Sequence, residues 1–368
     1  MDFSFLKKLG LPKFSFNFLA GKPSRMCGID IGAHSTKVVQ LRYEKERAIL
    51  ETYGELINEG YFKGGGSGGG WILKHLDADC AALIKDIMTE SHVTTTEIVA
   101  SIPASSSFVT MIPFSRILPK EIEAALPFEA RKYIPIPMSE VVLDHEIIGS
   151  NETEGPLEVL LVAVPKEIIE KFKRVAGLAG CTLRSLEIET FSCVRSLVGS
   201  DQTPTAIVNI GHLSTNLVIV DRGKIHVSHN FSHGSHELTN ALERGLAVNT
   251  ERAETIKREI GLSDRIEERE MVSIIAPLVE TTFSEIERLI SIYNRKAPRT
   301  IQKINLTGGG SNLKGIIDYA STKFGIEVTR GNPFSRVVTP AFMQPILRDI
   351  GPGFAVAVGL ALREITSP

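Results

Sequence analysis

The sequence predicts a two-lobed α/β protein in which one structural unit occurs twice and a small α/β subdomain is inserted into the first lobe. Three observations predict this class: the length of 368 residues, a repeat that places Asp30 on Asn209, and a change of pattern between Ile98 and Leu183. A single hydrophobic core stops growing near ~250–300 residues, so a chain of this length should form two units. Two lobes imply a cleft between them.

The composition is that of an ordinary soluble protein, with 43% hydrophobic and 23% charged residues. A net charge of -2 gives no electrostatic basis for nucleic acid as a partner. No apolar run approaches the ~18 residues of a membrane-spanning helix. The cysteines are scattered without a CxxC pair, which is typical of reduced thiols in the cytoplasm. They are Cys27, Cys80, Cys181 and Cys193.

Two segments have compositions that do not predict a packed element. Residues 1–26 form a basic and aromatic N-terminal tail, which either contacts an anionic membrane or a partner or is a poorly ordered terminus. Residues 63–70 read KGGGSGGG, which is a flexible linker composition. We expect this segment to be a surface loop, because no strand and helix bracket it as they bracket a phosphate loop.

The first lobe core is predicted to comprise residues 27–97 and 184–203. Residues 27–53 alternate as strand, turn, strand, turn and strand, which indicates a β-meander. Apolar residues then recur at helical spacing over residues 74–91, so we expect an amphipathic helix there.

The inserted subdomain is predicted at residues 98–183, where short strands and helical patterns alternate between prolines. The expected strands are 98–102, 108–112, 141–148 and 158–164, and the expected helices are 119–133 and 166–179. Residues 204–368 then form the second lobe, which ends in an apolar helix at 353–364.

The repeat places two hairpins in equivalent positions. Ile29-Asp30-Ile31-Gly32 aligns with Val208-Asn209-Ile210-Gly211, and Ser35-Thr36 aligns with Ser214-Thr215. Matching glycine and hydroxyl residues at one offset are not expected of two unrelated hairpins. A glycine turn with small neighbours exposes backbone N–H groups, which bind anions. Two facing copies would clamp one polyphosphate.

Asp30 precedes the glycine of the first turn and carries a negative charge. A carboxylate beside phosphates needs a cation between them, and Mg²⁺ usually keeps several waters that a carboxylate can hold. Asp30 is therefore predicted to bind Mg²⁺ through water.

A third glycine cluster, Leu306-Thr307-Gly308-Gly309-Gly310-Ser311-Asn312-Leu313, follows an apolar strand at 301–306 and is expected to open a helix that continues through Tyr319. A strand, a glycine turn and a helix start form a pocket lined by backbone, which a flat base can approach closely. Together with the two phosphate hairpins, this cluster predicts an adenosine site.

With these motifs, residues 27–365 resemble the actin-like ATPase superfamily and, within its FtsA/PilM group, the PilM family of type IV pilus assembly proteins. The similar segments are GIDIGAHSTKVVQL (28–41), VNIGHLSTNLVIV (208–220), AETIK (253–257) and LTGGGSNLKGI (306–316). IVASIPASS (98–106) and ALPFEARKYIPIP (125–137) are similar to the PilM family in particular. The resemblance implies a two-lobed actin-like, ribonuclease H-like duplicated fold.

The resemblance also implies a role for each matching residue. The residues implied to bind ATP and Mg²⁺ are Asp30, Gly32, Ser35, Thr36, Lys37, Asn209, Gly211, Ser214, Thr215, Glu254, Lys257, Gly308, Gly309, Gly310 and Asn312. Lys37 would reach a phosphate oxygen, and Glu254 and Lys257 would contact the ribose or base. Alternatively, Lys37 is merely exposed, and Glu254 and Lys257 form an ordinary i,i+3 surface pair.

Two positions depart from the family pattern. Ala33 follows Gly32 where a small hydroxyl residue is usual, and Asn209 stands where the second phosphate motif usually has Asp. An amide can hydrogen-bond a magnesium water, but it contributes no negative charge and is no base. We therefore expect this replacement to weaken ATP hydrolysis more than ATP binding. Whether the protein hydrolyses ATP stays open.

The resemblance implies an ATP-binding cytoplasmic scaffold of pilus assembly, peripheral at the inner membrane. Its partner would be the N-terminal cytoplasmic peptide of a PilN-like membrane protein, bound in a groove between the insertion and the first lobe. Other pilus components and self-association stay open.

Two alternatives are an FtsA-like cell-division protein and a small-molecule kinase. FtsA-like chains generally carry a C-terminal amphipathic membrane helix, whereas this sequence ends at Pro368, soon after helix 353–364. A kinase needs a carboxylate base in the cleft, for which Asp144 and Glu189 are the candidates.

A group of histidines, His226, His229, His233 and His236 with His212 nearby, suggests zinc. If residues 225–231 form a strand, however, His226 and His229 point to opposite faces. We therefore expect exposed or hydrogen-bonded histidines in place of a metal site.

Overall fold

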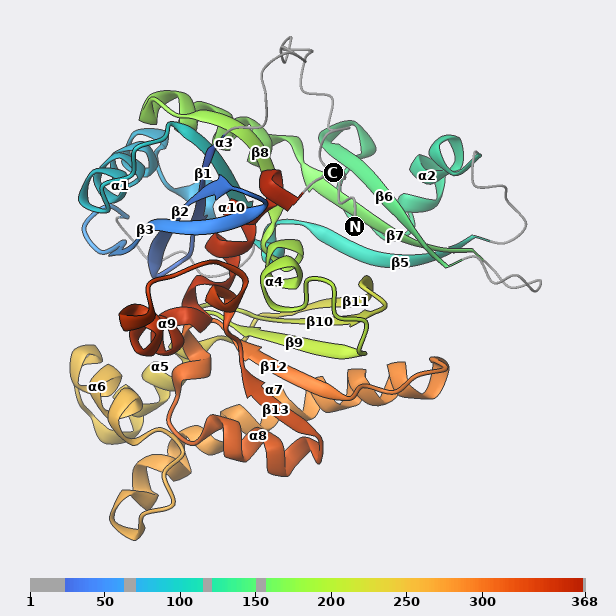
Figure 1. Ribbon diagram of the computed structural model, residues 1–368. Coiled ribbons are helices and arrows are strands. Elements are labelled where there is room, and N and C mark those ends of the chain that lie inside the picture. Colours follow the sequence, from blue (N-terminus) through green and yellow to red (C-terminus); the bar gives the residue numbers. More distant parts are fainter. Residues whose placement is uncertain (1–23, 63–70, 115–120, 150–156, 367–368) are drawn as a thin grey trace.

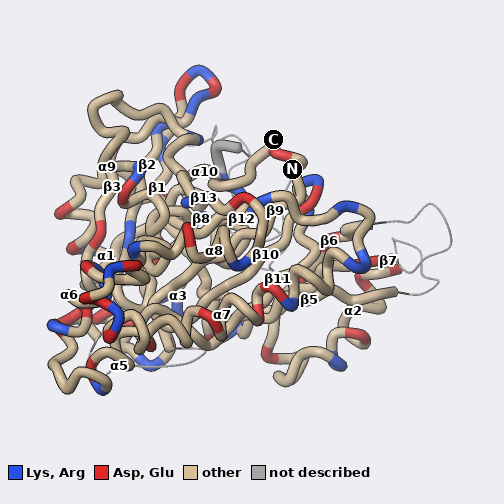
Figure 2. Tube along the Cα trace, turned by 90° about the horizontal axis from the view of Figure 1, so that it is seen from below, with Lys and Arg blue, Asp and Glu red and all other residues tan. Residues whose placement is uncertain are grey.

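The computed structural model describes residues 24–62, 71–114, 121–149 and 157–366 (Figure 1). The glycine-rich loop at 63–70 and residues 1–23 of the predicted tail lie outside the described residues. The described chain contains two five-stranded sheets and one three-stranded sheet. Figure 2 shows Lys and Arg interspersed with Asp and Glu along the trace.

The two large sheets have the same topology, which confirms the predicted duplication. Each begins with an antiparallel meander of three strands. Its first strand then pairs in parallel with a later strand, which in turn pairs in parallel with the fifth strand. The first sheet, in the order β3-β2-β1-β4-β8, comprises β1 (Arg25–Ile31), β2 (Ser35–Glu44), β3 (Arg47–Ile57), β4 (Glu97–Ile102) and β8 (Thr182–Ile188). The second, in the order β11-β10-β9-β12-β13, comprises β9 (Thr205–Ile210), β10 (Thr215–Asp221), β11 (Lys224–Phe231), β12 (Lys303–Thr307) and β13 (Glu327–Arg330).

The repeat extends to the register and the turns. Ile31 pairs with Thr36 in the first meander, and the equivalent residues Ile210 and Thr215 pair in the second. The next turn of each meander has two central residues with positive φ, Lys45 and Glu46 in one copy and Arg222 and Gly223 in the other. Two-residue turns of this kind match the twist of the flanking strands. Both copies therefore connect their second and third strands with the same type of turn.

Four helices cover the two faces of the first sheet (Figure 1). They are α1 (Asp77–Glu90), α3 (Lys166–Ala179), α4 (Glu189–Leu197) and α10 (Ala355–Thr366). Successive residues of a strand point to opposite faces: Val38 packs in a cluster with Ile84 of α1, whereas Val39 packs in a cluster with Ala357 of α10. The predicted helix at 74–91 corresponds to α1.

The C-terminal helix α10 returns to the first lobe, although residues 204–368 were predicted to belong to the second. It packs on β1 at Gly28, where a Cβ atom would come within 2.2 Å of the Ala357 carbonyl oxygen. Residues 341–363 are long and apolar enough to cross a membrane by composition, but 67% of that stretch is buried inside the protein. Its apolar character therefore serves the first-lobe core.

Helices α5 (Ser235–Leu246), α6 (Thr250–Ile260), α7 (Arg269–Lys296) and α8 (Ile316–Phe324) pack against the second sheet. Alternate residues of β9 divide between two cores. Ala206 and Val208 pack with these helices, whereas Ile207 packs in the cluster of the first lobe. The second sheet is therefore covered on both faces, and one apolar core runs between the lobes.

The inserted subdomain is the three-stranded sheet of β5 (Phe108–Phe114), β7 (Leu157–Pro165) and β6 (Val141–Gly149), with α2 (Ile122–Ala130). It is narrower than the predicted range 98–183, because β4, α3 and β8 pack in the first lobe. The insertion also touches the second lobe: the Lys224 ammonium donates hydrogen bonds to the carbonyl oxygens of Ile147 at 3.0 Å and Ile148 at 2.8 Å.

Candidate nucleotide-binding cleft

A cleft with a volume of about 1060 Å³ lies between the two lobes. Strand ends, turns and helices from both lobes line it, as the duplicated topology requires. Of the predicted site residues, those that line it are Asp30, Gly32, Ser35, Lys37, Asn209, Gly211, Ser214, Glu254, Lys257, Gly308, Gly309, Gly310 and Asn312. Thr36 and Thr215 do not.

The two glycine turns have the same geometry. The Gly32 N–H donates to the Ser35 carbonyl oxygen at 3.1 Å, and the Gly211 N–H donates to the Ser214 carbonyl oxygen at 2.8 Å. A Cβ atom would come within 2.8 Å of the first of these oxygens and within 2.9 Å of the second. A side chain would therefore force each turn open, which is why glycine begins both.

The two threonines support the turns from behind. Thr36 and Thr215 each follow a serine that faces the cleft, so strand alternation directs them to the opposite face. The Thr36 hydroxyl donates to Asn58 Oδ1 at 2.9 Å, and Asn58 Nδ2 donates to the Gly32 carbonyl oxygen at 2.7 Å. The Thr215 hydroxyl donates to the His233 carbonyl oxygen at 2.7 Å. Both hydroxyl groups are therefore engaged behind the turns, away from the cleft in which they were predicted to bind the nucleotide.

Asp30 and Glu189 place two carboxylates in the cleft. Asp30 Oδ1 accepts a hydrogen bond from the Ser101 hydroxyl at 2.7 Å. Glu189 is the first residue of α4, and its Oε1 accepts from the Ala104 N–H at 2.8 Å and from Asn216 Nδ2 at 3.0 Å. Burial raises the pKa of Asp30. Burial and the nearby charge of Asp30 raise the pKa of Glu189 to about 7.

Lys37 lies directly across the strand pair from Asp30. Its ammonium donates to the Ser35 hydroxyl at 2.7 Å and forms an ion pair with Glu55 at 3.1 Å. At the equivalent position of the second hairpin, Asn216 lies across from Asn209. The first hairpin thus has a cation and an anion where the second has two amides.

The glycine cluster packs against the end of β9. Gly308 has a φ of 80°, and a Cβ atom on it would come within 2.4 Å of Asn209 Oδ1. A Cβ atom on Gly310 would come within 2.3 Å of Ile210 Cγ2, whereas one on Gly309 would meet nothing within 4 Å. Gly309 therefore faces open space. The cluster begins a 3-10 helix, η7 (Gly309–Asn312), and α8 follows only at Ile316, later than predicted.

Helix α6 presents a network of charged residues to the cleft. The Glu254 carboxylate pairs with the Lys257 ammonium at 2.6 Å and with the Arg258 guanidinium at 2.8 Å, and it accepts from the Thr239 hydroxyl at 2.8 Å. Burial opposes ionisation of Glu254, but these donors outweigh it and lower its pKa to about 2. Glu254 and Lys257 are thus both an i,i+3 ion pair and part of the cleft wall.

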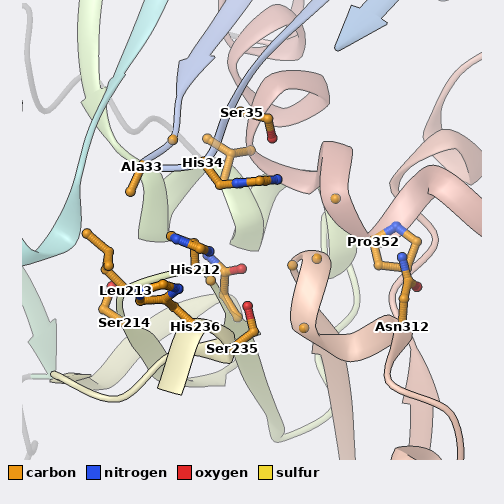
Figure 3. Close-up of a pocket in the computed structure, with 18 of the residues that line it drawn as sticks. Ala33, His34, Ser35, His212, Leu213, Ser214, Ser235, His236, Asn312 and Pro352 are labelled. Carbon is orange, nitrogen blue, oxygen red and sulfur yellow. The ribbon is translucent and has the colours of Figure 1, made fainter. Parts of the chain in front are cut away.

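Three histidines meet in the cleft, of which the sequence pattern included His212 and His236 but not His34. The rings of His34 and His212 stack with centroids 4.9 Å apart, and those of His212 and His236 lie 4.6 Å apart (Figure 3). His226 and His229 instead lie on β11, where His226 contacts the ring of Tyr293 from α7 and His229 contacts the ring of Phe231. Among the described residues, no group of three or more His, Cys, Asp or Glu side chains is arranged to hold a metal ion.

Comparison with solved structures shows the fold. The PilM-PilN type IV pilus biogenesis complex matches with a TM-score of 0.79 and 24% identity, over 94% of this chain and 99% of that chain. MreB5 of Spiroplasma citri bound to AMPPNP matches with a TM-score of 0.52 and 13% identity, over 91% of this chain and 94% of that chain. The chain therefore has the two-lobed actin-like fold that the sequence predicts.

Sequence comparison distinguishes between the FtsA and PilM families. The cell division protein FtsA of Bacillus subtilis is 21% identical over 268 residues, which are 63% of this chain and 58% of that protein. The chain thus spans little more than half the length of this relative. The profile of type IV pilus assembly protein PilM matches residues 28–365, which is nearly the whole chain. The chain belongs to the type IV pilus assembly protein PilM family.

Proposed function

We propose that this protein is a cytoplasmic scaffold of type IV pilus assembly that binds Mg-ATP between its lobes and the cytoplasmic segment of a PilN-like membrane protein on its inserted subdomain. One observation carries the nucleotide part: two equivalent glycine turns, from Gly32 and from Gly211, open on one cleft of about 1060 Å³. In a glycine turn, the backbone N–H groups that are not bonded within the turn can bind an anion.

The cleft residues fit a magnesium nucleotide. Asp30 would hold Mg²⁺ through water, and Lys37 would bind a phosphate oxygen after leaving Glu55. The open space at Gly309 would admit the adenosine, with α6 on its other side. Bound Mg²⁺ would neutralise part of the phosphate charge beside Asp30. MreB5, which shares this fold, was solved with AMPPNP.

The solved PilM-PilN complex, which matches over 94% of this chain, supports a PilN-like partner. The inserted sheet is in contact with both lobes, because Lys224 of the second lobe binds two carbonyl oxygens at the end of β6. A movement of the second lobe about bound nucleotide would therefore be transmitted to the insertion. This contact is a physical route by which ATP would control partner binding.

Glu189 favours a second activity, slow ATP hydrolysis. A pKa of about 7 lets this carboxylate take a proton from an attacking water near neutral pH. The charge that is missing at Asn209 would keep the rate low. Asp144, the other acid considered as a base, lies on β6 and outside the cleft lining. Transfer of the terminal phosphoryl group to water therefore fits the cleft better than transfer to the hydroxyl group of a bound substrate.

Isothermal titration calorimetry with Mg-ATP tests the nucleotide site. We expect one ATP per chain in the wild type and at least tenfold weaker binding in Asp30→Ala. Asp318→Ala, at an exposed position of α8, is a control that removes the same charge outside the cleft. Wild-type affinity in Asp30→Ala would contradict the assigned site, and no ATP binding in the wild type would contradict the function.

A further inference from the structure

The three stacked histidines of the cleft are not a product of the duplication. His34 aligns with Leu213 in the repeat, and His212 aligns with Ala33. His34 belongs to the first glycine turn, His212 to the second, and His236 to the first turn of α5. Nonequivalent positions of the two hairpins have thus each acquired a histidine, and the folded chain brings these side chains together between the lobes.

The histidines lie on the path that a phosphate chain must take. Both glycine turns line the space between the lobes, and the stacked rings of His34 and His212 lie in that space (Figure 3). The backbone N–H of His236 donates to the His212 carbonyl oxygen at 3.0 Å, which fixes the second turn against α5. An anion held by both turns would therefore contact these imidazoles.

Charged groups from several elements face the stack. Near His34 and His212, the acids are Glu55 on β3 and Glu254 on α6, and the cations are Lys37 on β2 with Lys257 and Arg258 on α6. Glu237 lies one residue after His236 and also lines the cleft. These acids already have partners: Glu55 pairs with Lys37, Glu254 pairs with Lys257, and Glu237 contacts His233 Nδ1 at 3.0 Å. The surroundings therefore supply little free negative charge to an imidazolium.

Without an anion, burial favours the neutral form of two of these rings. Burial lowers the pKa of His34. Burial, followed by the neighbouring His236 and His34, lowers the pKa of His212 to about 3. Stacked neutral rings are compatible with the observed distances, whereas adjacent imidazolium ions would repel each other. Each neutral ring also offers only one N–H donor, against two in the protonated form.

We propose that His34, His212 and His236 form a proton-accepting site for the phosphate chain of the nucleotide, so that nucleotide binding and proton uptake occur together. This inference rests on the proposed nucleotide site. The phosphates supply the negative charge that the stack lacks, and each protonated ring gains a second N–H for a phosphate oxygen. The proton comes from solvent and remains on the imidazole while the nucleotide is bound.

The sign of the pH dependence follows. The imidazoles bind protons less readily in the free protein than in the complex, so binding takes up protons at any pH between the two pKa values. The affinity for Mg-ATP therefore rises as the pH falls through the pKa of the complex. If binding takes up one proton, Kd falls by at most about tenfold for each unit by which the pH is lowered. Adenosine, which lacks phosphate, should bind with no such dependence.

Calorimetry of the full chain with Mg-ATP at pH 7.0, in phosphate-free buffers of different ionisation enthalpy, measures proton uptake directly. We expect uptake of between half a proton and two protons per ATP in the wild type, as an order-of-magnitude estimate from the number of rings. In the double variant His34→Gln and His212→Gln, uptake should fall by at least half. Glutamine keeps one N–H donor on a side chain of similar reach but has no proton to gain.

The outcomes separate this inference from the proposed function. ATP binding by the wild type with no proton uptake, or with the same uptake in the double variant, would overturn the inference and leave the nucleotide site intact. Uptake that disappears in Glu189→Gln but persists in the double variant would assign the proton to the carboxylates and also overturn it. If the wild type binds no ATP, the proposed function itself fails. Thermal unfolding of each variant checks that it is folded.

Discussion

Asn216 Nδ2 donates a hydrogen bond to Glu189 Oε1 at 3.0 Å, and this contact joins β10 of the second lobe to the start of α4 in the first. Asn216 stands where the duplicated hairpin has Lys37. The first hairpin therefore uses this position for a cation at the cleft, and the second uses it to hold the carboxylate of the opposite lobe. The two duplicated halves therefore use equivalent positions for different contacts.

Glu189 should destabilise the folded protein at neutral and alkaline pH. Its pKa rises from 4.5 to about 7 on folding, so the folded protein binds more protons than the unfolded chain between these values. The free energy of unfolding therefore falls as the pH rises through this window, by up to about 3 kcal/mol. Glu189→Gln should raise the thermal unfolding midpoint at pH 8 and leave it nearly unchanged at pH 4.5. Equal shifts at both pH values would contradict the assigned pKa.

Gly309 and Gly308 are a matched pair for locating the adenosine. Gly309→Ala has open space, so we expect unchanged thermal stability but weaker ATP binding, because the methyl group enters the cleft. Gly308→Ala should instead destabilise the fold by more than about 1 kcal/mol, because of its positive φ and the nearby Asn209 side chain. Calorimetry and thermal unfolding measure both effects. Normal ATP affinity in Gly309→Ala would place the adenosine elsewhere.

Asn209→Asp should raise the rate of ATP hydrolysis. The change restores a carboxylate at the position equivalent to Asp30, where it can hold a magnesium water. Steady-state phosphate release measures the rate, and Asn209→Ala, which adds no charge, is the control. A rate as low as that of the wild type would show that Asn209 does not limit turnover.

Lys224→Met should weaken the coupling between the second lobe and the inserted subdomain. Methionine keeps an apolar chain of similar length but loses the two hydrogen bonds to Ile147 and Ile148 of the insertion. We expect Mg-ATP and the PilN-like peptide each to bind with wild-type affinity, while the effect of one on the other falls by at least half. Lys314→Met is the control, because the Lys314 ammonium donates to the Glu259 carbonyl oxygen within the second lobe. Undiminished coupling in Lys224→Met would exclude this route.

Local sequence signals were sufficient for the duplicated hairpins. The tight turns at Gly32 and Gly211 and the two positive-φ turns after β2 and β10 each depend on residues close together in the chain. Strand alternation, applied within β2, would also have shown that Thr36 points away from Ser35 and Lys37. The resemblance implied nucleotide binding at Thr36, whose side chain this alternation directs away from the cleft.

Features that depend on contacts between distant segments could not be predicted. The apolar composition of α10 indicates burial but does not say which sheet covers it, and the decisive contact is with Gly28. The same holds for the stack of His34 and His212, because only the closing of two lobes brings those turns together. The histidine pattern in the sequence grouped His212 and His236 with histidines of β11 and left out His34, which is distant in the chain.

Titration of the N-terminal cytoplasmic peptide of the PilN protein from the same organism, with and without Mg-ATP, tests the central claim most directly. We expect binding of one peptide per chain and a change in its Kd of at least threefold when Mg-ATP is present, a change that disappears in Asp30→Ala. A peptide that does not bind, or that binds with the same Kd whether or not ATP is present, would contradict the claim of a nucleotide-controlled scaffold.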